Sequence, residues 1–149
     1  SRSSNVVSLY SIHRLMIQLF YPQSFNPDFK LFLSSKNLDF LKTTLSSYPN
    51  SLPNYQNIPS HFHKYLMPSA FLNKQNNNIK IYSKNGNAGG YISDVMFLND
   101  EEHHVKYFLS VSMLNYKQKS YYKRRVIYTT PGIDVFRKIS NVLYEYAKK

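Results

Sequence analysis

The sequence contains no cysteine and no tryptophan, and glycine occurs only 4 times in 149 residues. Without cysteine, a disulfide framework, a thiolate zinc site and a cysteine nucleophile are all excluded. No apolar run is long enough to span a bilayer, so no transmembrane segment is expected. Residues 1–11 lack the apolar core and the cleavage signature of a signal peptide. The compartment stays open, because many exported proteins also lack disulfides.

Acidic residues are scarce as well. Asp and Glu number 8 against 19 Lys and Arg, which gives a formal net charge of +11. A basic chain favours acidic partners such as nucleic acid, anionic lipid or wall polymers. Most of the basic residues are scattered, however, and only residues 117–125 form a cluster. The hydrophobic content of 42% and the aromatic content of 16% are typical of a packed globular chain.

The length suits one domain with a core of its own. The chain begins with Ser1 and has no initiator methionine, so we interpret it as a processed product or as a piece of a longer protein. The expected organisation over residues 1–149 is therefore a single domain or a partial domain.

The first part, residues 1–78, predicts helices and irregular segments. Ser8 is a good helix cap, and the apolar residues that follow it repeat at helical spacing until Pro22. A second helix is expected from Ser34 or Ser35 to just before Pro49, by the same signals.

The second part, residues 79–149, predicts strands and a last helix. Alternating apolar residues and short connections indicate an antiparallel meander of three strands. Thr130 is expected to cap the last helix, with Pro131 at its first position. The class is α+β, with helices covering the sheet. The expected strands are 79–83, 90–98 and 104–114, with a turn at 99–102, and the expected buried helix stripe is Phe136, Ile139, Leu143 and Ala147.

The glycines gather in one window, residues 80–100, which holds Gly86, Gly89 and Gly90. Lys84 stands there at the predicted end of a strand, two residues before Gly86. Glycine lets a ligand approach the main chain closely, and an edge strand can bind an extended substrate or stabilise an oxyanion through its N–H groups. The alternative is a plain hairpin turn built on Asn-Gly.

The histidines suggest a metal only weakly. His61 and His63 flank a phenylalanine in a proline-rich connection, and His103 and His104 are adjacent near a turn. A metal site needs ligands that converge on one point and are oriented by hydrogen bonds from neighbouring groups. No metal and no other cofactor is expected.

The basic segment 117–125 interleaves lysine and arginine with tyrosine. Such a segment can stack on bases and contact phosphates, or it can be a solvated loop. Ser120 and Lys123 also fit Ser-x-x-Lys, a hydrolase nucleophile pattern. That serine usually opens a buried helix, whereas this one lies in a charged loop, so we interpret the match as chance.

Several stretches together resemble the C-terminal part of the serine β-lactamase-like, or penicillin-binding-protein-like, hydrolases of bacteria. They are "SNVVSLYSIHRLMIQLFYPQSF", "SSKNLDFLKTTLSSYPNSLPNYQN", "IKIYSKNGNAGGYISDVMFLND", "VKYFLSVSMLNY" and "YEYAKK". The resemblance spans nearly the whole chain. It implies the C-terminal portion of an α/β sandwich, in which a strand bearing Lys-Thr/Ser-Gly is followed by two more strands and a helix packed on the sheet.

The resemblance assigns roles to few residues. Lys84 matches the catalytic lysine, Gly86 the glycine, and Asn87 the residue that offers a backbone N–H to the oxyanion hole. Asn85 replaces the Thr/Ser whose hydroxyl would bind a β-lactam carboxylate, which puts antibiotic hydrolysis in doubt. Asp94 stands where relatives carry an acid. The nucleophilic Ser-x-x-Lys would precede this chain, so its catalytic partner is expected to be the N-terminal remainder of the same protein.

The resemblance therefore implies a serine hydrolase that cleaves an amide or ester of a small molecule or peptide through an acyl-enzyme. In it, Lys84 would be catalytic, and Asn85, Gly86 and Asn87 would bind substrate. Such relatives are exported, periplasmic or membrane-anchored. One alternative is a non-catalytic relative that binds a cell-wall ligand. A basic nucleic-acid-binding module is the other, and no nucleic acid is expected under the main hypothesis.

Overall fold

The computed structural model describes residues 7–26, 31–48, 51, 53–58, 63–72, 78–88, 91–114 and 124–149. Its elements confirm the α+β class, with an antiparallel sheet in the order β1-β2-β3. The main elements are α1 (Leu9–Phe20), α2 (Ser35–Ser46), β1 (Ile79–Ala88), β2 (Tyr91–Asp100), β3 (Val105–Leu114) and α3 (Arg124–Ala147), with short 3-10 helices at Pro22–Ser24, Pro53–Tyr55 and Ser69–Phe71.

Side-chain caps begin the first two helices, as predicted. The Ser8 hydroxyl accepts a hydrogen bond from the backbone N–H of Ser11, and the Ser34 hydroxyl accepts one from the N–H of Asn37. Each bond satisfies one of the N–H groups that lack a partner within the helix. The helix α1 ends at Phe20, two residues before Pro22, so both sequence signals are confirmed.

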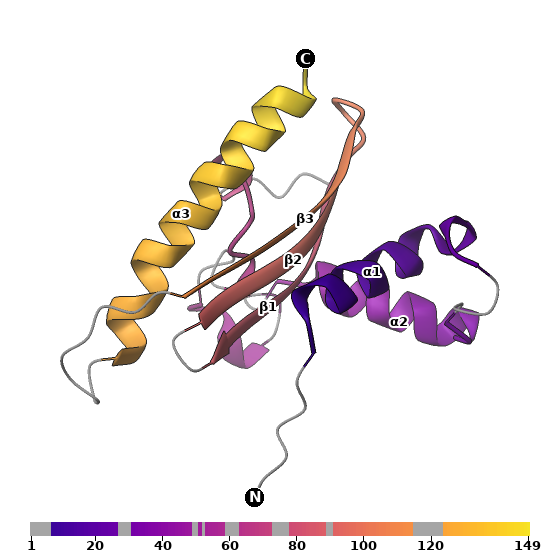
Figure 1. Ribbon diagram of the computed structural model, residues 1–149, viewed down its shortest axis with the longest axis horizontal. Coiled ribbons are helices and arrows are strands. Elements are labelled where there is room, and N and C mark those ends of the chain that lie inside the picture. The colour runs from indigo at the N-terminus through magenta and orange to yellow at the C-terminus, as the bar shows by residue number, and fades with distance from the viewer. Residues whose placement is uncertain are drawn as a thin grey trace, which may run out of the picture.

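The sheet is the middle of three layers. In Figure 1, α1 and α2 lie on one face of the sheet, and α3 runs along the other face. The central strand alternates accordingly. Val95 and Phe97 pack with residues of α1, whereas Met96 and Leu98 pack with residues of α3. Because successive side chains of a strand point to opposite faces, β2 is buried on both sides.

Aromatic rings fill the layer between α1 and the sheet. Phe97 and Phe108 face each other across β2 and β3, with ring centroids 4.4 Å apart. Phe20, near the end of α1, lies 4.4 Å from Phe97 and 4.5 Å from Tyr82 of β1. These contacts fix α1 against the middle of the sheet.

The layer on the opposite face contains α3 and the segment 63–72. Tyr65 contacts Phe136 of α3, and Phe71 contacts Tyr144 of α3. The Ser69 N–H also donates to Asn141 Oδ1 at 2.8 Å. The segment is therefore held to α3 by both apolar and polar contacts.

The expectation for the buried stripe of α3 was wrong in part. Phe136 is buried as expected, but Ile139 and Leu143 are exposed and so is Ala147. The residues that face the sheet follow another row of the helix, namely Ile133, Phe136, Ser140 and Tyr144. The prediction of the buried side failed because α3 carries apolar residues on its outer side as well, so the apolar pattern does not identify the side that faces the sheet.

The start of α3 and the strand ends also differ from prediction. The helix begins at Arg124, so Thr130 is not its cap, and Pro131 is an interior residue rather than the first one. The strands β1 and β2 extend to Ala88 and Asp100, and the turn between β2 and β3 comprises residues 101–104. The predicted strands were too short because polar residues have a low strand propensity. In the structure, pairing with the neighbouring strand extends them over these residues.

Candidate functional site at the edge of β1

The window Lys84 to Asn87 lies inside β1, and the hairpin-turn alternative for Asn85 and Gly86 is wrong. The two strands pair without interruption, so that Lys84 lies opposite Val95, Asn85 opposite Asp94 and Gly86 opposite Ser93. Lys84 is therefore not at the end of its strand. Gly89 and Gly90 lie outside the described residues.

The four residues of this window divide between the two faces of the sheet. Ile81 packs with the core under α3, so the odd-numbered positions Asn85 and Asn87 share that face. The even-numbered positions Lys84 and Gly86 share the face of Tyr82, which packs with α1. The side chains of Lys84 and Asn85 therefore do not converge.

The backbone groups of Asn85 and Asn87, in contrast, point to one common side, the free side of β1. Ile81 accepts a hydrogen bond from Lys64 Nζ through a carbonyl that points away from β2. Because N–H and C=O directions alternate along an antiparallel strand, the backbone groups of Asn85 and Asn87 point away from β2 as well. Lys84 is exposed, and its Nζ donates to the Asn85 carbonyl at 2.6 Å. This edge combines an ammonium with outward-pointing N–H groups.

The packing between β1 and β2 favours a glycine at position 86. A Cβ atom at this position would lie 2.8 Å from the Ser93 Oγ on β2. A side chain would therefore force Ser93 to turn. The close approach that Gly86 permits is to the neighbouring strand, and this contact is a structural role in addition to any contact with a substrate.

A buried polar cluster lies directly behind this edge. Lys64 is fully buried, and its Nζ donates to the carbonyls of Leu45, in the last turn of α2, and Ile81, each at 2.7 Å. The ammonium also lies 5.0 Å from the centre of the Tyr48 ring. Lys64 thus joins the C-terminal end of α2 to the edge strand, at the end of the helix dipole that favours a cation.

Asp94 is the acidic member of this cluster. Its carboxylate is fully buried and accepts hydrogen bonds from the Leu66 N–H at 3.0 Å and the Ser83 hydroxyl at 2.6 Å. Ser83 directly precedes Lys84, and Asp94 lies opposite Asn85. The acid at this position, for which the resemblance gave no role, therefore ties the segment 64–66 to the strand that carries the candidate site.

Burial shifts both charged groups of the cluster. It lowers the pKa of Lys64 to about 8, although the charge of Asp94 opposes this shift. Burial likewise raises the pKa of Asp94 to about 6, against the hydrogen bonds from Ser83 and Leu66 and the charge of Lys64. Desolvation thus outweighs the attraction between the two groups.

These shifts predict how the pair contributes to stability as the pH changes. The raised pKa of Asp94 adds stability below its ordinary value of 3.8 that is lost as the pH rises through about 6. The lowered pKa of Lys64 adds stability above 10.5 that is lost as the pH falls through about 8. We therefore expect the pair to contribute least to the free energy of unfolding between pH 6 and 8. The gain at acidic pH from Asp94 and the gain at alkaline pH from Lys64 are each worth at most about 3 kcal/mol.

Urea unfolding of the chain and its Asp94→Asn variant between pH 4 and 8 measures the contribution of Asp94 to this pH dependence. The difference between their free energies of unfolding should change by up to about 3 kcal/mol over this range. A difference that does not depend on pH would contradict the raised pKa of Asp94.

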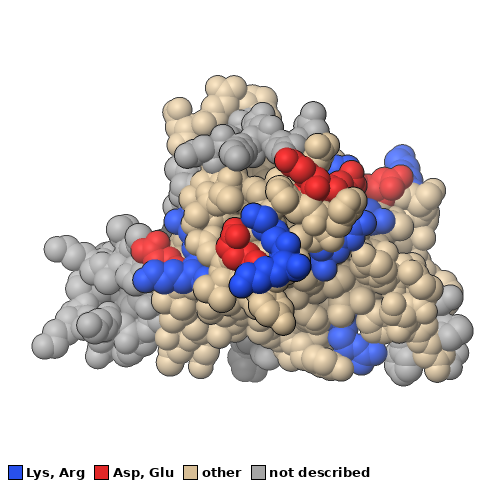
Figure 2. Space-filling model, turned by 90° about the horizontal axis from the view of Figure 1, so that it is seen from above, with Lys and Arg blue, Asp and Glu red and all other residues tan. Residues whose placement is uncertain are grey.

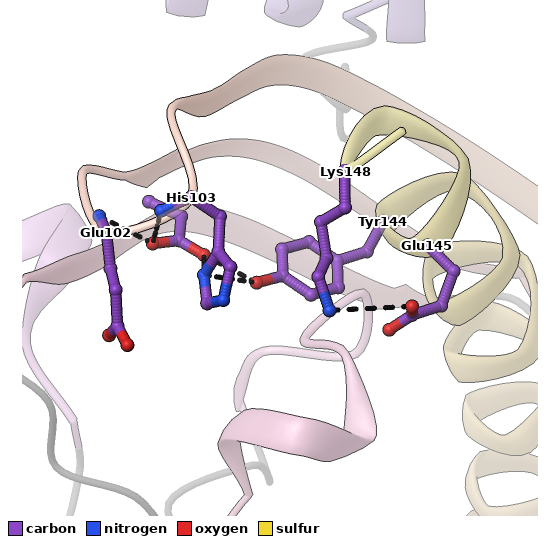
Figure 3. Close-up of polar contacts among 6 residues, drawn as sticks. Glu102, His103, Tyr144, Glu145 and Lys148 are labelled. Carbon is purple, nitrogen blue, oxygen red and sulfur yellow. Dashed lines mark hydrogen bonds and ion pairs between the residues drawn. The ribbon is translucent and has the colours of Figure 1, made fainter.

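A second polar cluster joins the turn between β2 and β3 to α3 (Figure 3). The buried Asp100 carboxylate accepts hydrogen bonds from the backbone N–H groups of Glu102 and His103, at 3.0 and 3.2 Å. It also accepts one from Tyr144 OH at 2.5 Å and lies 2.8 Å from His103 Nδ1. His104 follows with a φ of 57°, in the left-handed region.

The hydrogen bonds to Asp100 decide its protonation. Burial alone raises the pKa of Asp100, but the bonds from Tyr144 and His103 outweigh it and hold the pKa below its ordinary value. Burial and the bond to Asp100 together raise the pKa of Tyr144. At neutral pH Asp100 is therefore a carboxylate held by hydrogen-bond donors from the turn and from α3, which suits a structural clamp of the turn.

Several other sequence candidates find no support as sites. His61 and most of the basic segment, residues 115–123 with Ser120 and Lys123, lie outside the described residues. Among the described residues, no three His, Cys, Asp or Glu side chains are grouped so that they could hold a metal ion. None of the helices in this part of the chain is long and apolar enough to cross a membrane.

Comparison of the chain with protein-family models, curated proteins and solved structures gave no match. The candidate site therefore rests on its own geometry. Sequence reasoning missed the roles of Lys64, Asp100 and Tyr144. The contacts of Lys64 and the Asp100–Tyr144 contact join distant parts of the chain, and no local pattern marks them. The bonds from the Glu102 and His103 N–H groups to Asp100 are local, and an Asp just before a turn is a signal that could have indicated them.

Proposed function

We propose that the edge of β1 is one wall of the active site of a β-lactamase-like serine hydrolase. In this proposal a serine outside these 149 residues attacks an amide or ester carbonyl and releases the amine or alcohol, and water then cleaves the acyl-enzyme. Lys84 supplies a positive charge beside the substrate, and the N–H of Asn87 supports the oxyanion.

The observation that carries the proposal is the combination of Lys84 and Asn87 on one exposed strand edge. The ammonium lies on the face of α1 and α2, and the Asn87 N–H points away from β2. An extended substrate can add to such an edge through main-chain hydrogen bonds. The order of two helices, three antiparallel strands and a helix along the opposite face supports the same class.

Asn85 bears on the choice of substrate. Its position on the α3 face separates its amide from the Lys84 ammonium, so the Asn85 side chain does not take the place of the hydroxyl that would bind a β-lactam carboxylate beside that lysine. The proposal is therefore hydrolysis of an amide or ester other than a β-lactam.

A nucleic-acid-binding function finds less support. Figure 2 shows acidic and basic side chains side by side on the face that it draws, rather than one continuous basic stripe. Binding along the backbone of a nucleic acid favours a groove or stripe of one sign. The remaining alternative, a relative that binds a cell-wall ligand without cleaving it, uses the same strand edge and is separated by experiment.

The replacement Lys84→Ala should lower the rate of acylation by about 100-fold in the full gene product that contains this chain, because a preorganised charge at the substrate is lost. Labelling with a fluorophosphonate probe measures this rate. Lys80→Ala is the matched control, since Lys80 is exposed on the same face of the same strand. It should leave the rate within about two-fold, as screened surface charges contribute little.

A gene product that never becomes acylated, yet binds a peptidoglycan fragment in a Lys84-dependent way, would favour the non-catalytic relative. If the two variants and the parent protein are labelled at the same rate, Lys84 is not part of the site. An upstream sequence without Ser-x-x-Lys would also contradict the catalytic proposal.

A further inference from the structure

The outer side of α3 carries an apolar stripe that nothing in the described part of the chain covers. Val142 and Tyr146 are 70% and 75% exposed, and Val135 and Ile139 are exposed as well. The helix already packs its other side against the sheet through Phe136 and Tyr144, whereas α1 and α2 lie beyond the sheet on the opposite face (Figure 1). A helix that is apolar on both sides is normally buried on both sides.

The spacing of the stripe indicates what kind of surface would cover it. Val135, Ile139, Val142 and Tyr146 follow one another at intervals of 4, 3 and 4 residues. This is the alternation of positions d and a in a coiled coil, where two helices meet along a seam. The partner that fits the stripe is therefore another helix that runs nearly parallel or antiparallel to α3.

The charges beside the stripe indicate which helix. Lys138 and Glu145 each directly precede a stripe residue, so both lie on the same flank, and both are exposed. In an antiparallel copy centred between Ile139 and Val142, residue 138 faces residue 143 of the other chain. Lys138 then lies within about 3 Å, along the axis, of Glu145 in the other chain, and the symmetry forms this pair twice.

We propose that two copies of this chain associate through α3, antiparallel and related by a two-fold axis. Val135 packs on Tyr146 of the other copy, and Ile139 packs on Val142. The two Lys138–Glu145 pairs flank this seam and select the antiparallel direction. The inference does not depend on the proposed hydrolase activity, because it concerns the face of α3 that points away from the strand edge of the candidate site.

Sedimentation velocity over a range of concentrations tests the proposal on the intact gene product. A dimer is expected, and Val142→Glu should weaken its association by at least about 100-fold, since the charge is buried twice in each dimer. Tyr10→Glu is the control, because Tyr10 is exposed on α1 and removed from the seam. It should leave the association unchanged. Circular dichroism checks that both variants stay folded.

Charge reversal gives a second test that a simple loss of folding cannot mimic. Lys138→Glu alone should weaken the dimer, and adding Glu145→Lys should restore it, because the pairs reform with opposite sign. A monomer at all concentrations would overturn the proposal. A dimer that survives Val142→Glu, or a double variant that is no better than the single one, would overturn it as well.

Discussion

Replacing Asp94 by alanine is expected to lower the free energy of unfolding by about 3–5 kcal/mol. The substitution removes the acceptor of the Leu66 N–H and the Ser83 hydroxyl. It also leaves the Lys64 ammonium buried without a nearby carboxylate. Urea unfolding followed by circular dichroism measures the change, and an unchanged m-value shows that the difference is one of stability.

A matched double variant separates the charge effect from the loss of hydrogen bonds. Lys64→Met combined with Asp94→Leu removes both charges and keeps most of the buried volume. It should be less destabilised than Asp94→Ala, because an apolar pair avoids the desolvation of two ions. If the double variant is as unstable as the single one, the cost arises from the lost hydrogen bonds rather than from the unpaired charge.

The cluster of Lys64 and Asp94 also bears on the proposed site. Lys64 Nζ donates to the Ile81 carbonyl at the free side of β1. This carbonyl is therefore not available to pair with another extended chain. Asp94 fixes Ser83, the residue before Lys84. The available edge thus begins next to Lys84, and the buried cluster determines where a substrate would start to pair.

The sequence was sufficient to predict the elements whose signals are local. Ser8 and Ser34 announce their helices because a cap needs only the next three residues. The period-two pattern of residues 105–113 predicted β3, because one side of that strand lies on the core. The meander followed from connections that are too short for any other topology.

The features that escaped prediction depend on distant partners. Asn85 and Gly86 are common in turns, yet here they continue a strand because β2 pairs with them. The face that α3 buries depends on the segment 63–72, which packs Tyr65 and Phe71 against it. In the candidate site, Lys84 was singled out by sequence, whereas the opposite orientation of Asn85 required the register of the sheet.

Replacing Asp100 by alanine is expected to be the other strongly destabilising change, by about 2–4 kcal/mol. Tyr144 OH, in the core, would lose its acceptor, and so would the two N–H groups that close the turn between β2 and β3. The β2–β3 turn and the last turns of α3 should then open together, because the Asp100 carboxylate accepts hydrogen bonds from both of them. Thermal unfolding measures the overall loss.

A double-mutant cycle with Asp100→Ala and Tyr144→Phe distinguishes this link from a purely local turn. The two single changes should be strongly non-additive, with a coupling of about 1–3 kcal/mol, because each removes the same hydrogen bond. His103→Gln should cost less than Asp100→Ala, since the imidazole is 41% exposed. If the cycle is additive, the β2–β3 turn and α3 are stabilised independently. Amide exchange of Glu102 and His103 would then accelerate in Asp100→Ala but not in Tyr144→Phe, whereas a true clamp accelerates it in both.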